Sequence, residues 1–88
     1  MPMQVEHLKK ELEQNGYQRI PSNVEAISLF FRIEEKTAIG VCVVDNRRQI
    51  LKENGLFETV MQKTETLLKT KAEGVKMMAL IVDRKSVV

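Results

Sequence analysis

Acidic and basic side chains recur where apolar runs of this chain end, and these residues are the ones whose types could perform chemistry. Glu34 and Lys36 form a Glu-x-Lys pair, Asp83 and Lys85 form an Asp-x-Lys pair, and Asp45 ends a further apolar run. Clustered carboxylates bind Mg²⁺, and a nearby lysine stabilises the charge that develops during phosphodiester cleavage. The pattern therefore indicates one candidate chemistry, a divalent-metal nuclease site, although such spacings also arise by chance in a chain that is 30% charged.

The single histidine and the single cysteine do not form the pattern of a nucleophile with its base. His7 lies in a segment with helical periodicity, and Cys42 lies between Val41 and Val43, where a thiol usually behaves as a small buried hydrophobe. The chain contains no Gly-x-Ser-x-Gly sequence, and its glycines are isolated from one another, so no phosphate-binding loop is predicted. We therefore expect no catalytic residue and no cofactor.

Length and charge place the chain among small globular domains. Its 88 residues suffice for a single domain, 1–88, with a modest core. The net charge is +2 and the basic residues alternate with glutamates, so nucleic acid is not an expected partner. A lone cysteine favours a reducing cytosol. The longest apolar stretch, Met77–Val82, is far below the ~20 residues of a membrane span, so we expect no membrane insertion by this segment.

Apolar residues spaced by three or four predict a helix at about 3–15, ended by Asn15–Gly16, and a longer helix at about 54–72. The face of the first helix that carries its lysines and glutamates is expected to lie in solvent. In the longer helix the stripe of apolar residues is interrupted by Thr64. Both helices are therefore amphipathic, and each should cover a sheet with one face.

Apolar runs predict strands at about 25–33, 38–45 and 75–83, and Gln49–Leu51 could add a short one. The polar segment Glu34–Thr37 has the length of a hairpin loop, so the first two strands should pair antiparallel. The last strand should return through a right-handed helical crossover. The order α-β-β-(β)-α-β predicts an α+β (more broadly α/β) fold, a two-layer sandwich with both helices on one face of a mixed sheet.

The arrangement of these segments is similar to the cytosolic domain that precedes the membrane part of rhomboid-family intramembrane serine proteases of Gram-positive bacteria. The residues that carry the resemblance span almost the whole chain, and they are Asn15–Gly16–Tyr17, Leu29–Phe30–Phe31–Arg32, Val43–Val44–Asp45 and Ala79–Leu80–Ile81–Val82. The resemblance implies a segment on the cytoplasmic side of a bacterial membrane, with an accessory role. Rhomboids cleave with a serine and a histidine in their membrane helices, and neither can be matched here, so no catalytic residue carries over.

Three hypotheses follow. The first is a non-catalytic cytosolic domain of a rhomboid-like protease that contacts a protein partner or its own membrane domain, in a chain that continues into membrane helices beyond Asp83. Its contact surface would be an exposed sheet edge or the hairpin Phe31–Ala38. The second is a stand-alone interaction protein, such as a dimer that pairs sheet edges. The third is the divalent-metal nuclease, with Glu34, Asp45 and Asp83 as its ligands.

Overall fold

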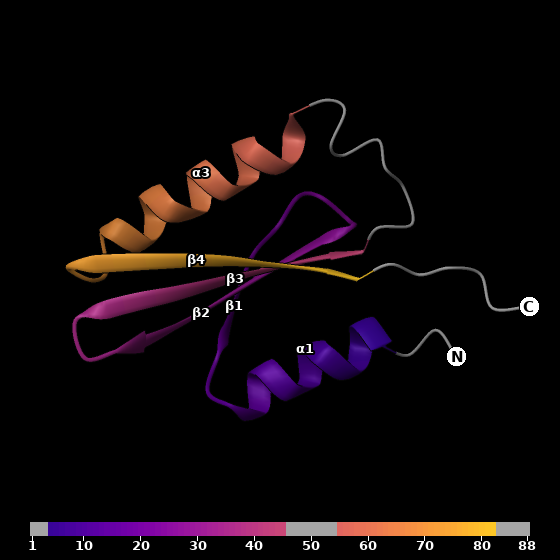
Figure 1. Ribbon diagram of the computed structural model, residues 1–88, viewed down its shortest axis with the longest axis horizontal. Helices are drawn as coiled ribbons and strands as arrows, with labels where there is room; N and C mark the ends of the chain where they lie inside the picture. The colour runs from indigo at the N-terminus through magenta and orange to yellow at the C-terminus, as the bar shows by residue number, and fades with distance from the viewer. Residues whose placement is uncertain (1–3, 46–54, 83–88) are drawn as a thin grey trace, which may run out of the picture.

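The computed structural model describes residues 4–45 and 55–82, in which two helices and four strands are formed (Figure 1). In chain order these elements are α1 (Gln4–Gln14), β1 (Gln18–Ile20), β2 (Ile27–Glu34), β3 (Thr37–Asp45), α3 (Leu56–Lys69) and β4 (Gly74–Val82). The strands form one sheet in the order β1-β2-β3-β4, in which β1, β2 and β3 pair antiparallel and β4 pairs parallel to β3. The predicted α+β class, a mixed sheet with two helices packed on it, is confirmed.

Most elements lie within one residue of the bounds that the sequence predicts, and two differ for local reasons. β2 begins at Ile27 because the Ile27 N–H donates to the Val24 carbonyl at 3.1 Å, which makes the preceding residues a turn. α3 ends at Lys69, earlier than the predicted bound of 72, because the Lys71 N–H donates to the Leu68 carbonyl and closes the last turn. The short strand considered at Gln49–Leu51 lies outside the described residues.

The two helices cover opposite faces of the sheet, which differs from the expected packing of both on one face (Figure 1). Successive side chains of a strand point to opposite faces, and both parities of the central strand β3 are apolar and buried. Each face therefore needs its own cover. Under α3 lie Ile27, Leu29, Cys42 and Val44. Under α1 lie Phe30, Val41 and Val43, together with Val5 of the helix.

A short strand between α1 and β2 completes the sheet at one edge. α1 ends at Gly16, whose φ of +89° suits glycine, and the Tyr17 N–H donates back to the Leu12 carbonyl at 3.0 Å. Gln18–Ile20 then pairs with β2 as strand β1. Within residues 4–45 and 55–82, neither helix has the length and apolarity that crossing a membrane requires.

Candidate functional site

The predicted metal-binding carboxylates come at strand ends, and the sheet separates the two that the structure describes. Glu34 is the last residue of β2 and lies opposite Thr37, the first residue of β3, whereas Asp45 is the last residue of β3. The extended chain from Thr37 to Asp45 spans about 26 Å at roughly 3.3 Å per residue. Glu34 and Asp45 therefore lie at opposite ends of the sheet and cannot bind one metal ion together.

The remaining parts of the predicted metal site are not brought together either. Glu34 forms an ion pair with Arg32 of the same strand. Asp83 and Lys85 lie outside the described residues. Among residues 4–45 and 55–82, no three side chains of the histidine, cysteine, aspartate or glutamate type are placed to hold a metal ion. The described part of the chain thus gives the nuclease hypothesis no support.

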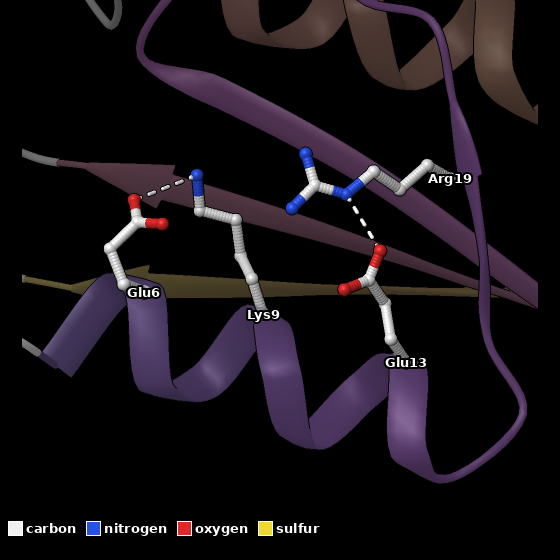
Figure 2. A network of polar contacts seen from close by, with 4 residues as sticks. All are labelled: Glu6, Lys9, Glu13 and Arg19. Atoms are coloured by element: carbon white, nitrogen blue, oxygen red, sulfur yellow. Dashed lines mark hydrogen bonds and ion pairs between the residues drawn. The ribbon is translucent and has the colours of Figure 1, made fainter.

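A small polar cavity of about 210 Å³ lies between α1 and the end of β3. Asp45, which is 7% exposed, lines this cavity together with Glu25 and Ser28. Lys9 enters it from α1, and its Nζ lies 3.1 Å from Glu6 Oε2 (Figure 2). The sequence placed Lys9 on a solvent face, but its side chain is only 16% exposed. Because charges of both signs line the cavity, it does not present one charge to a ligand.

Two arginines on the α1 face of the sheet also hold that helix. Arg19 Nε donates to Glu13 Oε2 at 2.9 Å (Figure 2), and its guanidinium lies 5.4 Å from the centre of the Phe30 ring. Arg32 Nη1 donates to the Asn15 carbonyl, where α1 ends, at 2.9 Å. Both guanidinium groups are therefore engaged within the fold, and they do not form a basic stripe of the kind that binds nucleic acid.

The histidine and the cysteine lie on opposite sides of the sheet. His7 lies on α1 with an exposed side chain, and its Nε2 is 3.3 Å from Glu11 Oε1. Cys42 is fully buried on the other face, under α3. Burial raises the pKa of the Cys42 thiol to about 11, so the thiol stays protonated at neutral pH and is a poor nucleophile. The two residues cannot act as a nucleophile and its base.

The hairpin that connects β2 and β3 is tied to the loop before β4. The Lys36 carbonyl accepts hydrogen bonds of 3.0 Å from the N–H groups of Glu73 and Gly74, and Lys36 Nζ lies 3.7 Å from Glu73 Oε2. Beside it is an open depression of about 600 Å³, lined by Glu34, Glu35, Thr37, Ile39 and Lys76. This lining mixes both charges with one aliphatic side chain, and it favours no particular class of ligand.

The outer edge of β4 is the most distinctive surface of the described residues. β4 pairs with β3 along all nine of its residues, and no described strand pairs with its other edge. Met78 and Ile81 are 47% and 46% exposed, and they point to opposite faces because their positions differ in parity. Lys76 is the only charged residue of the strand. Open, apolar strand edges of this kind are typical of surfaces that pair with another polypeptide strand.

Known proteins offer no match. Neither a family model, nor a curated protein, nor a solved structure matches this chain. Its function must therefore be inferred from the surfaces and side chains described above.

The sequence named a sheet edge as a candidate surface but did not indicate which strand forms it. The strand order answers this, since β1 and β4 are the two edges. Met78 lies within the apolar stretch Met77–Val82, yet its side chain is 47% exposed. The apolar run of β4 resembles that of the central strand β3, so periodicity does not separate an edge strand from a buried one.

Proposed function

We propose that this chain is a non-catalytic interaction domain that acts through protein contacts made at the outer edge of β4. We further propose that it belongs to a rhomboid-like intramembrane protease, on the cytoplasmic side of a bacterial membrane, and that its contacts position or regulate that protease. The proposal assigns no reaction to the chain itself. Its chemical groups fit that role, since Cys42 is buried and protonated and the arginines of the sheet hold α1.

The observation that carries the proposal is the contrast between the two edges of the sheet. β1 is three residues long and includes a charged arginine, and both features discourage pairing with another chain. β4 is nine residues long and apolar except for Lys76. A long apolar edge exposes a strand to aggregation, so it is usually kept in a protein only where another polypeptide covers it.

The rhomboid setting rests on a resemblance to the cytosolic domain of rhomboid-family proteases. The resemblance lies in the order of the segments and in the short sequences that end the first helix and form the strands. The structure has the order α1-β1-β2-β3-α3-β4, in which the segments quoted for the resemblance fall at the end of α1 and within β2, β3 and β4. The rhomboid setting therefore rests on the segment order and these short sequences alone.

The reading frame that encodes this chain provides the first test. Membrane helices with a serine and a histidine in the same polypeptide support the rhomboid setting, whereas a frame without membrane helices refutes it and favours the stand-alone interaction protein. In the full-length protein, Ile81→Lys tests the contact surface. We expect it to change cleavage of a transmembrane reporter at least several-fold, and we expect Ile33→Lys to leave cleavage unchanged.

Ile33 is a matched control because it is also an isoleucine, is 44% exposed and points to the same face of the sheet as Ile81, but it lies on β2, an inner strand of the sheet order, and not on β4. Equal cleavage by wild type and Ile81→Lys would contradict a functional role for the β4 edge.

A further inference from the structure

The outer edge of β4, with which no strand of the described residues pairs, is suited to one partner in particular. We propose that β4 pairs antiparallel with β4 of a second copy of this chain, about a two-fold axis that passes midway between the two Met78 residues. The two four-stranded sheets then form one continuous sheet of eight strands. This inference rests on the proposed function, because it names the partner that the β4 edge contacts.

The register follows from the length of the strand. Met78 is the midpoint of Gly74–Val82, so pairing centred there uses all nine residues of both copies. Val75 then lies opposite Ile81 of the second copy, and Met77 lies opposite Ala79 of the second copy. Met78 lies opposite its own counterpart. The exposed apolar side chains Met78 and Ile81 thus both meet apolar side chains, which is the arrangement that cross-strand pairs favour.

The charge pattern of the strand is also compatible with self-pairing. Lys76 lies opposite Leu80 of the second copy, and its long aliphatic part can pack there while the ammonium group stays in water. The two Lys76 residues are four positions apart along the paired strands, which is about 13 Å at roughly 3.3 Å per residue. That separation exceeds the Debye length of about 8 Å at physiological ionic strength, so their repulsion is weak.

Symmetry makes a second copy a better occupant than an unrelated strand. A two-fold axis perpendicular to the sheet relates antiparallel strands to each other, and it places the same surface of both copies in the interface. The same axis keeps α3 of both copies on one face of the continuous sheet and α1 of both copies on the other. Each face of the extended sheet then keeps the helical cover that it has in one copy.

Sedimentation equilibrium of the full chain, from about 1 µM to 1 mM, tests the dimer. We expect a concentration-dependent monomer–dimer equilibrium for the wild type. Met78→Lys should weaken the dimer at least tenfold, because it places two lysines directly opposite each other. Ile33→Lys should leave the dimer unchanged. A wild type that stays monomeric up to 1 mM overturns the proposal, and so does equal weakening by both variants.

Disulfide formation tests the register without requiring a destabilising charge. In Met78→Cys the two introduced cysteines face each other, with Cα atoms about 4.5–5.5 Å apart, a separation that a disulfide can bridge. Cys42 is fully buried and does not compete. Lys76→Cys is the control, because its cysteines lie about 13 Å apart along the strands.

Mild oxidation should therefore link Met78→Cys into a covalent dimer and leave Lys76→Cys monomeric on a non-reducing gel. Cross-linking of neither variant, of both, or of Lys76→Cys alone overturns the proposal. These experiments test the dimer separately from the proposed function. The proposed function is tested by the reading frame and by reporter cleavage in the full-length protein, so either proposal can be refuted without the other.

Discussion

Gly40 occupies the most tightly packed point of the sheet, and replacing it with alanine tests how α3 packs on the strands. A Cβ atom built at Gly40 would lie 2.5 Å from Met77 Sδ and 2.8 Å from Leu68 Cδ1. Both distances are shorter than the contacts of real Cβ atoms, so a neighbour must move. Gly40 pairs regularly with Phe31 and with Met77, so the strand has no bulge at this glycine. Its role is to make room for the helix.

The size of the effect follows from which neighbour can move. Met77 is half-buried on the edge strand, and its flexible thioether can swing away, whereas Leu68 is fully buried in α3. Overpacking of a core costs about 1–3 kcal/mol, and replacing glycine in a strand recovers about 0.5–1 kcal/mol of backbone entropy. We therefore expect Gly40→Ala to lower the free energy of unfolding by about 1–2 kcal/mol.

Urea unfolding followed by circular dichroism measures this loss, at one protein concentration because any dimerisation adds to stability. For an m value of about 1–2 kcal/mol/M the midpoint should fall by about 1 M. Gly74→Ala is the matched control, since its Cβ would meet only Thr37 Oγ1, at an ordinary 3.5 Å. In a Met77→Ala background, Gly40→Ala should cost about 1 kcal/mol less. A midpoint for Gly40→Ala at or above that of the wild type would refute this account of the packing.

Three further predictions concern individual side chains. Burial raises the pKa of the Cys42 thiol from 9.0 to about 11, so on raising the pH the thiol ionises in the unfolded chain before it ionises in the folded one. The free energy of unfolding should therefore fall by about 1.4 kcal/mol per pH unit between pH 9 and pH 11. Unfolding curves of Cys42→Ala should lack this decrease. Thr64 is buried and donates its hydroxyl to the Val60 carbonyl at 2.8 Å within its own helix, so Thr64→Val should leave the free energy of unfolding within about 0.5 kcal/mol of wild type. A loss above about 2 kcal/mol in urea unfolding would show that the hydroxyl is needed. Arg32→Ala removes a hydrogen bond to the end of α1 and should lower the free energy of unfolding by about 1 kcal/mol in the same assay. Lys36→Ala breaks only an exposed ion pair and should lower it by less than about 0.5 kcal/mol. Equal losses for the two variants would argue against the role of Arg32.

The sequence predicted the elements well because their signals are local. The glycine that ends α1 and the apolar spacing of both helices can be recognised without knowledge of tertiary contacts. The placement of the helices on two faces depends on which parity of each strand is buried, and in β3 both parities are apolar, so either arrangement was compatible with the pattern. The separation of Glu34 from Asp45 likewise depends on strand pairing, because both residues simply end apolar runs in the sequence.

Arg19 and Arg32, which the sequence did not offer for chemistry, help to hold the first helix on the sheet: Arg19 donates to Glu13 of α1, and Arg32 donates to the Asn15 carbonyl where α1 ends. Of the carboxylates that the sequence did offer, Glu34 forms an ion pair with Arg32, and Asp45 lines the cavity beside Lys9. On β4, with whose outer edge no described strand pairs, Met78 and Ile81 are 47% and 46% exposed. Any partner that adds a strand to this domain should therefore use β4, and substitutions of Met78 or Ile81 should alter association while leaving the unfolding of the monomer nearly unchanged.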